Sequence, residues 1–161
     1  MLFPFVNEVT EELFVMRCIT IWQPWATLIA LGEKKFETRS WATKHRDSIA
    51  IHAGKKVDKA ICQKEPFRSV LAKHGYTVNN LPTGSVVAVC RLADCLQVIE
   101  GCGGEVKLES PSQSIAIGDK ENAFGLFDAG RFAWELTDVR LLPKPIPAKG
   151  MQGLWNWEGN K

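Results

Sequence analysis

A strand, a short helix, a glycine turn and a second strand are predicted within residues 17–41, and this segment most strongly limits how the chain can fold. Residues 17–22 read RCITIW and are rich in β-branched side chains, which favour a strand. Pro24 suits the first position of a helix, because it has no N–H to leave unpaired. Gly32 follows the last apolar residue of that helix, where a glycine with positive φ commonly ends the element.

The chain is predicted to become extended again over residues 35–41. Because side chains two apart on a strand share a face, one face is expected to carry Lys35, Glu37, Arg39 and Trp41. Thr38 is expected on the opposite face, and Lys34 lies in the turn before the strand. A carboxylate and a guanidinium would thus lie side by side, next to an indole ring.

Further strands are predicted at residues 48–53, 85–98 and 131–142, from their runs of apolar and β-branched side chains. Asp58 is expected to cap a helix that reaches about residue 74, with a break or kink at Pro66.

Two later segments look less regular. Residues 100–125 are rich in Gly and Ser with mixed charge, which predicts a long loop. The tail after residue 142 holds three prolines and is predicted to be an extended covering segment. Trp155 and Trp157 are expected to close the core against it.

These elements favour a mainly β, α+β fold. Five or six strands and one or two helices without regular βαβ alternation indicate a small β-barrel with flanking short helices. A chain of 161 residues can bury one core of ordinary size, so residues 1–161 are predicted to form a single domain.

Composition excludes several classes of protein. A hydrophobic fraction of 45% and a charged fraction of 24% argue against a disordered chain. No apolar run approaches the ~20 residues of a membrane span, so no membrane association is predicted. The net charge of +2 excludes a polycation that binds nucleic acid indiscriminately, although basic residues are dense between Lys34 and Lys56.

The cysteines and the N-terminus predict a cytoplasmic location. The five cysteines are an odd number and form no C-x-x-C pair, which favours free thiols. Cys18 and Cys90 lie in apolar runs and are predicted to be small core residues. No recurring zinc spacing is present, so neither a metal site nor a cofactor is predicted. The first residues lack the positively charged region of a secretory signal.

The run QPWATLIALGEKKFETRSWATKHRDSIAIHAGK resembles the ASCH family, a group of PUA-like β-barrels. The family pattern is Gly-x-Lys followed by an acidic or hydroxyl residue and then Arg, and it is matched by Gly32, Lys34, Glu37 and Arg39. The Gln-Pro-Trp and Arg-Ser-Trp flanks resemble the subfamily that includes the ASCH domain of a eukaryotic transcriptional coactivator. The segments GRFAWEL and PIPAKGMQGLWNW are similar to the closing strands of bacterial single-domain members.

The resemblance implies association with RNA or another nucleic acid, in a cleft lined by the Gly-x-Lys segment. It also implies a possible hydrolase, because one group resembles an amidohydrolase that removes acetyl from acetylcytidine. There the motif lysine acts with a threonine three residues later and a separate glutamate. Here Lys34 holds the lysine position and Glu37 the threonine position, while Glu100, Glu105 and Glu109 all remain open for the glutamate. Other members resemble metal-assisted ribonucleases.

The same side chains permit structural and functional roles. Arg39 suits bidentate contact with a phosphate, or an ion pair with Glu37. Lys34 is either an ordinary solvated lysine or a desolvated amine that polarises a carbonyl or binds phosphate. Glu37 is either a general base for an attacking water or an ionised carboxylate that orients a base edge. Lys34 and Glu37 are therefore the catalytic candidates.

Tryptophans near the motif are candidates for base stacking, which contributes roughly 1–3 kcal/mol per base. Trp41 is preferred because it shares the predicted face of Glu37, and Trp22 is the second candidate. Trp25 and Trp155 are predicted to be core residues.

Basic residues flank the motif on both sides. The residues predicted to form a phosphate-binding rim are Lys44, His45, Arg46, Lys55 and Lys56, and Arg39 is predicted to contact phosphate as well. His52 alternates with core isoleucines, which indicates a hydrogen-bonded interior histidine.

Three functions follow from these patterns. The first is a non-catalytic module that binds RNA, or a nucleoside or nucleotide ligand, with an unpaired base in the cleft. The second is a hydrolase that acts through Lys34 and Glu37 on a modified nucleoside or on RNA. The third is a protein-interaction barrel without a ligand, whose protein partner is not indicated by the sequence.

Overall fold

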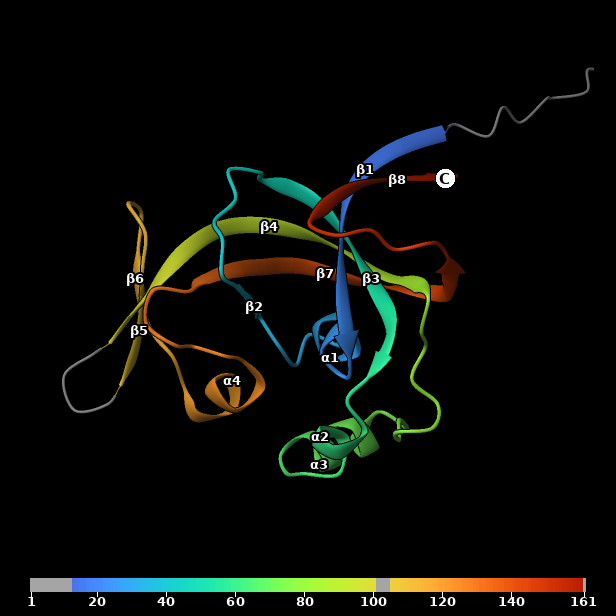
Figure 1. Cartoon of the computed structure of the whole chain (residues 1–161), viewed down its shortest axis with the longest axis horizontal. Helices are drawn as coiled ribbons and strands as arrows, with labels where there is room; N and C mark the ends of the chain where they lie inside the picture. The colour runs from blue at the N-terminus through green and yellow to red at the C-terminus, as the bar shows by residue number, and fades with distance from the viewer. Residues whose placement is uncertain (1–12, 101–104, 161) are drawn as a thin grey trace, which may run out of the picture.

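The computed structural model describes residues 13–100 and 105–160, where a strongly bent β-sheet carries short helices at one end (Figure 1). The strands are β1 Leu13–Gln23, β2 Phe36–Arg39, β3 Asp47–Val57, β4 Ser85–Glu100, β5 Val106–Glu109, β6 Ser114–Ala116, β7 Phe132–Pro147 and β8 Leu154–Asn160. The helices are α1 Trp25–Ala30, α2 Lys59–Cys62, α3 Phe67–Lys73 and α4 Asp119–Phe124.

The sheet follows the order β2-β7-β4-β3-β1-β8, and β5 and β6 branch from the far end of β4. β1 and β3 pair in parallel, whereas the other pairs are antiparallel. The mainly β fold with flanking short helices is confirmed, although the sheet has eight strands and the described chain four helices, more than the five or six strands and one or two helices predicted. Within the described ranges, no helix is long and apolar enough to cross a membrane.

The predicted strand, helix, turn and strand are all present. β1 ends at Gln23, α1 begins after Pro24, and Gly32 has a φ of +74°. The Leu28 carbonyl accepts hydrogen bonds from the backbone N–H groups of Glu33 at 2.9 Å and Lys34 at 3.1 Å. This tight turn reverses the chain and directs the Lys34 side chain inward.

The helix predicted from Asp58 to about residue 74 is present as two pieces. The Asp58 carboxylate accepts a hydrogen bond from the Ile61 N–H at 3.0 Å and caps α2. Pro66 precedes the first residue of α3, so the predicted break is confirmed. α2 and α3 together cover one side of the sheet's end (Figure 1).

The prediction of a long loop over residues 100–125 is wrong for the part that the structure describes. β5, β6 and α4 lie there, and residues 101–104 fall outside the described residues. A few apolar side chains in this polar stretch are buried and anchor it to the rest of the fold. Leu108 is 0% and Phe124 is 1% exposed. α4 lies at the same end of the sheet as α2 and α3, to their left in Figure 1.

The C-terminal segment covers the core as predicted, and part of it is a strand. β8 pairs antiparallel with β1, with Trp155 opposite Cys18. Trp155 and Trp157 are buried and pack in one cluster with Cys18. Burial raises the pKa of the thiols of Cys18 and Cys90 to about 12, which fits their predicted place in the core.

Candidate functional site

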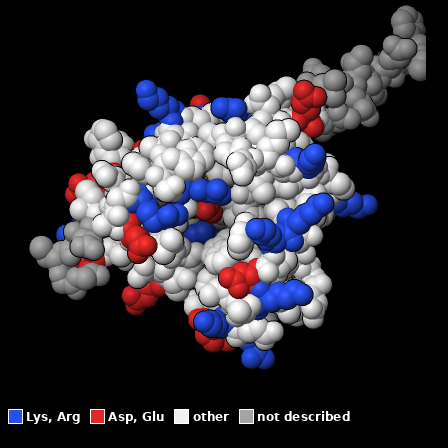
Figure 2. All heavy atoms as spheres, viewed as in Figure 1, with Lys and Arg blue, Asp and Glu red and all other residues white. Residues whose placement is uncertain are grey.

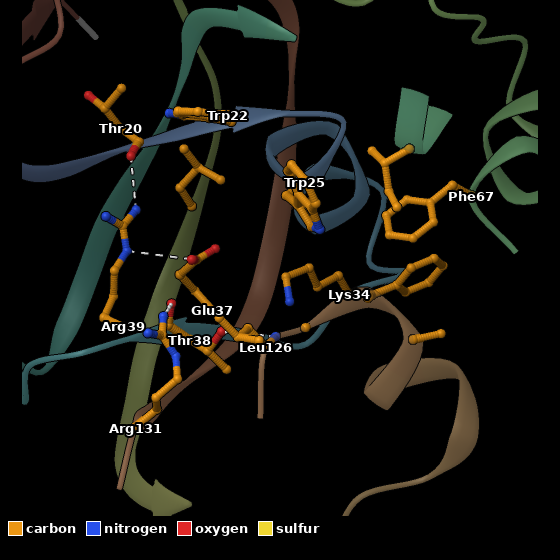
Figure 3. Close-up of a pocket in the computed structure, with 15 residues that line it drawn as sticks. Thr20, Trp22, Trp25, Lys34, Glu37, Thr38, Arg39, Phe67, Leu126 and Arg131 are labelled. Carbon is orange, nitrogen blue, oxygen red and sulfur yellow. Dashed lines mark hydrogen bonds and ion pairs between the residues drawn. The ribbon is translucent and has the colours of Figure 1, made fainter. Parts of the chain in front are cut away.

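A pocket of about 690 Å³ opens between the end of the sheet and the helices (Figure 3). Its walls come from β1, α1, β2, the α2–α3 pair and the segment around α4. The lining residues are Thr20, Ile21, Trp22, Trp25, Lys34, Glu37, Thr38, Arg39, Ile61, Phe67, Ala123, Phe124, Gly125, Leu126 and Arg131. Lys34, Glu37 and Arg39, which were singled out from the sequence, therefore share one cavity.

Lys34 is a buried amine without a partner. The residue is 2% exposed, and its Nζ has no hydrogen bond within the described part of the chain. Its side chain points past Trp25 towards Glu37 (Figure 3). Burial lowers the pKa of Lys34, and the negative charges of Glu37 and Glu121 oppose that shift. The desolvated amine foreseen as one alternative is thus the form present.

Among the described residues, only one carboxylate oxygen of Glu37 takes part in an ion pair. Its Oε1 lies 3.5 Å from Arg39 Nε, and its side chain is 12% exposed. Its Oε2 is buried and accepts no hydrogen bond from the described residues. A buried oxygen in this state costs about 1–3 kcal/mol unless a ligand or water supplies a donor.

Two arginines border the same cavity. Arg39 Nη2 donates to the Thr20 carbonyl at 2.9 Å, which holds the guanidinium across β1 and β2. Arg131 Nη2 donates to the Thr38 carbonyl at 3.2 Å, and its Nε is buried without a partner in the described chain. Arg131 was not among the site residues predicted from the sequence. β2 pairs antiparallel with β7, with Arg39 opposite Phe132, and this register brings Arg131 to the site.

Thr38 lines the pocket as well, although the strand pattern placed it on the face opposite Glu37. The residue is 7% exposed, and its Oγ1 accepts a hydrogen bond from the Leu126 N–H at 3.3 Å. The pocket reaches both faces of β2 because the α4 segment folds over this short strand. Glu121 of α4 holds it there by accepting hydrogen bonds from the N–H groups of Lys35 and Phe36, at 3.1 and 2.9 Å.

Aromatic side chains form the apolar wall. Trp22 is 51% exposed, and Lys56 Nζ lies 4.7 Å from the centroid of its ring. Trp25 is half-buried and meets Phe67 edge-on at 6.0 Å between ring centroids. Phe67 in turn meets Phe124 at 5.0 Å. Trp25 therefore joins the core, as predicted, and also faces the cavity.

Trp41 packs against Trp134, the residue paired with Glu37, and its stacking role stays a prediction. β2 ends at Arg39, and the alternation of side chains ends with it. The Trp41 ring packs edge-on against Trp134 at 4.8 Å, and the residue is 36% exposed. It does not line the pocket.

The predicted phosphate-binding rim is not at this pocket. Lys44 is exposed, and His45 Nε2 lies 2.9 Å from the Ser48 carbonyl. Arg46 donates to two carbonyls of its own loop and lies 3.6 Å from Asp94. Lys55 lines a different cavity. A role of these four residues in binding stays a prediction.

Two other assignments concern histidines and metals. His52 is 2% exposed, with Nδ1 3.1 Å from Thr20 Oγ1 and Nε2 2.7 Å from the Ala148 carbonyl. It is therefore the hydrogen-bonded interior histidine that the sequence indicated.

Over residues 13–100 and 105–160, no three His, Cys, Asp or Glu side chains gather in a way that could hold a metal ion.

Fold and pocket together define a class: a mainly β domain whose bent sheet and short helices enclose a partly charged cavity. Residues 19–142 match the ASCH domain, and the chain belongs to the ASCH domain family. It is also similar to "Activating signal cointegrator 1" of Homo sapiens, with 34% identity over 82 residues that cover 49% of this chain and 14% of that protein. The protein of the same name from Mus musculus gives the same identity and coverage.

Proposed function

We propose that this chain binds RNA by taking an unpaired nucleobase into the pocket of Lys34 and Glu37. One observation carries the proposal: a buried amine and a buried carboxylate oxygen, neither with a partner among residues 13–100 and 105–160, face one cavity of about 690 Å³. Cavities of this size are typical of small-ligand sites. A shallow surface would have favoured the protein-interaction barrel instead.

The unpaired groups complement the edge of a base. A base edge presents hydrogen-bond donors beside acceptors. Glu37 Oε2 can accept from an exocyclic amino group or a ring N–H, whereas Lys34 Nζ can donate to a ring nitrogen or a carbonyl. Pairing these atoms with a ligand would recover the 1–3 kcal/mol that each unpaired buried group costs.

The wall and the arginines suit the rest of a nucleotide. Trp22 is exposed beside the cavity and takes over the stacking role first given to Trp41. Arg131 Nε has no protein acceptor among the described residues and is suited to a sugar or phosphate oxygen. Membership of the ASCH family supports a nucleic-acid partner.

The test is a titration of the full chain with single-stranded RNA at several salt concentrations. Tryptophan fluorescence is the readout of binding. Affinity is expected to fall as salt rises, because phosphate contacts release counterions. Glu37→Gln keeps the size of the side chain and removes its charge, and it should weaken binding roughly ten-fold. Glu158→Gln, at an exposed position on β8 that lines neither cavity, is the matched control. RNA affinity that is unchanged in Glu37→Gln would contradict the proposal.

A second candidate function is hydrolysis through Lys34 and Glu37. The observation that favours it is the buried amine with lowered pKa next to a carboxylate with a free oxygen, with Thr38 in the same pocket. On an acylated base, Glu37 would take a proton from water as the water oxygen bonds to the acyl carbon. The bond from that carbon to the exocyclic nitrogen would break, and the nitrogen would receive a proton from Lys34 or Glu37.

The corresponding assay incubates the chain with acetylcytidine and, separately, with RNA, with and without divalent metal. Release of acetate or of shortened RNA is expected to disappear in Lys34→Ala and in Glu37→Ala. Thr38→Val separates two routes, because it would stop turnover only if the hydroxyl takes part. Turnover that persists in both the Lys34 and the Glu37 variants would remove these residues from the reaction. The cytoplasmic location stays a prediction, which cell fractionation would test.

A further inference from the structure

A second cavity, of about 920 Å³, borders the first at Thr20. It lies between the end of β3, the start of β4 and the segment that joins β7 to β8. Its lining residues are Thr20, His52, Gly54, Lys55, Gly84, Pro147, Ala148, Lys149, Gly150, Met151 and Gln152. Two lysines and no Asp or Glu are among them, so the cavity favours an anion.

The floor of this cavity already has its hydrogen bonds. Trp155 Nε1 donates to Thr20 Oγ1 at 3.1 Å, and Thr20 Oγ1 lies 3.1 Å from His52 Nδ1. His52 Nε2 donates to the Ala148 carbonyl at 2.7 Å, because a carbonyl can only accept. The floor therefore leaves no unpaired group to read a base edge, in contrast to the first pocket.

Gly150 keeps the cavity open. A Cβ at this position would lie 2.8 Å from both His52 Cε1 and Thr20 Oγ1, so any larger residue would displace the floor. The absence of a side chain lets a ligand approach the backbone closely.

The lysines are free to bind an anion. Lys55 and Lys149 are exposed, and neither forms an ion pair within the described ranges. Lys56, next to Lys55, lies over the ring of Trp22, which lines the first pocket. On the face shown in Figure 2, Lys and Arg side chains gather over the region where Figure 1 draws the end of β3. Positive charge thus continues from one cavity to the other.

We propose that the second cavity is a phosphate-backbone subsite, in which Lys55 and Lys149 hold the strand that flanks the base in the first pocket. The inference rests on the proposed function, since it assigns the neighbouring part of the same ligand. The occupant is single-stranded RNA, because the two cavities meet at Thr20 and the positive charge of Lys56 and Lys55 runs from Trp22 of the first pocket to the second. Each lysine contributes a point charge to phosphate, and base identity is not read here.

The experiment compares a long ligand with a short one. The long ligand is a labelled single-stranded RNA of mixed sequence with about twelve nucleotides, within the range of single-strand binding sites. The short ligands are the four ribonucleoside 5′-monophosphates, tested singly. In the double variant Lys55→Ala/Lys149→Ala, affinity for the long RNA should fall about ten-fold at low salt. The salt slope should become smaller by about 1.4, or about 0.7 for each lost contact. Binding of the monophosphates should not change.

The matched control is Lys64→Ala/Lys107→Ala, which removes the same charge at positions that line neither cavity. Equal losses in the two double variants would show that only net charge matters and would overturn the subsite. So would wild-type affinity in the Lys55/Lys149 variant, or a lysine-dependent preference for duplex RNA. If the monophosphates bind and the long RNA gains nothing, the subsite fails while the base pocket stands. If neither ligand binds the wild type, the proposed function fails too.

Discussion

Glu33 and Lys34 are adjacent in the chain, yet their charged groups have opposite surroundings. Glu33 Oε1 lies 2.9 Å from both Lys73 Nζ and His74 Nε2, and the Lys120 ammonium contacts Oε2. Hydrogen bonds from Lys120, His74 and Lys73 lower the pKa of Glu33 from 4.5 to about 2. The amine of Lys34, in contrast, is buried and has no partner in the described chain.

The difference separates a structural cluster from a binding site. The Glu33 cluster ties the turn after α1 to α3 and α4, the helices that also contribute Phe67 and Phe124 to the pocket wall. It is complete without a ligand, so its role is to hold these walls together. The site of Lys34 and Glu37 is incomplete, which costs stability unless a ligand supplies the missing partners.

The largest effect is expected for Lys34→Met, which keeps the length of the side chain and removes the amine. RNA affinity should fall at least ten-fold, because the donor to the base is lost. The free energy of unfolding should not decrease and should rise by about 1–3 kcal/mol, because an unpaired polar group leaves the interior. Titration with single-stranded RNA and urea denaturation measure the two quantities.

A pH series provides the control for this variant. The pKa of Lys34 is lowered below 10.5 in the folded chain, so the unfolded chain binds more protons between the two values. The stability that the wild type loses through Lys34 is therefore recovered as pH rises towards 10.5. The difference in free energy of unfolding between the wild type and Lys34→Met should become smaller over the same range. A loss of stability in Lys34→Met with unchanged binding would mean that Lys34 is structural, like Glu33.

A smaller effect is expected for Glu33→Gln, which removes the charge from the complete cluster. The free energy of unfolding should fall by about 1–2 kcal/mol at neutral pH, a discounted value because Lys73 and Lys120 are more than half exposed. The folded-state pKa is depressed, so this stabilisation is present above about 4.5 and is lost as pH falls towards about 2. Urea denaturation at several pH values measures it.

RNA affinity separates the two clusters in this experiment. Glu33→Gln should change RNA affinity much less than Lys34→Met does, when both are measured well below their denaturation midpoints. A larger loss of affinity in Glu33→Gln than in Lys34→Met would remove the distinction between the two clusters.

The smallest effect is expected for Glu121→Gln. Its carboxylate accepts from the N–H groups of Lys35 and Phe36, and an amide in its place retains one acceptor oxygen. The free energy of unfolding should fall by about 0.5–1 kcal/mol. The pKa of Lys34 should fall further, because one of the two carboxylates that oppose its desolvation is gone. Thermal unfolding and the pH series above measure these changes, and an unchanged pH series would show that Glu121 does not act on Lys34.

Much of the local structure was predictable because it depends on neighbouring residues. The turn at Gly32 and the cap at Asp58 follow from φ preferences and short-range hydrogen bonds. The strand predicted over residues 35–41 was too long, because nothing local shows that β2 ends at Arg39. That end depends on pairing with β7, nearly a hundred residues further along the chain.

The segment after residue 100 was also predicted incorrectly, because its structure depends on distant parts of the chain. Its Gly and Ser content hides Leu108 and Phe124, whose burial needs surfaces from distant strands and helices. Arg131 was missed for a related reason: the strands that became β2 and β7 were both predicted, but their pairing was not. Local propensity predicts where strands form, but the pairing of the strands decides which side chains come together at their ends.

By itself, the sequence determined that Lys34, Glu37 and Arg39 lie close together, because a tight turn and a short strand leave them no other arrangement. Only the tertiary structure decided that Lys34 is 2% exposed and unpaired. That state requires α4 to fold back onto β2, through contacts of Glu121 with Lys35 and Phe36. Hydration of a charge depends on every atom that surrounds it, so it is set by segments far apart in the chain and not by the motif alone.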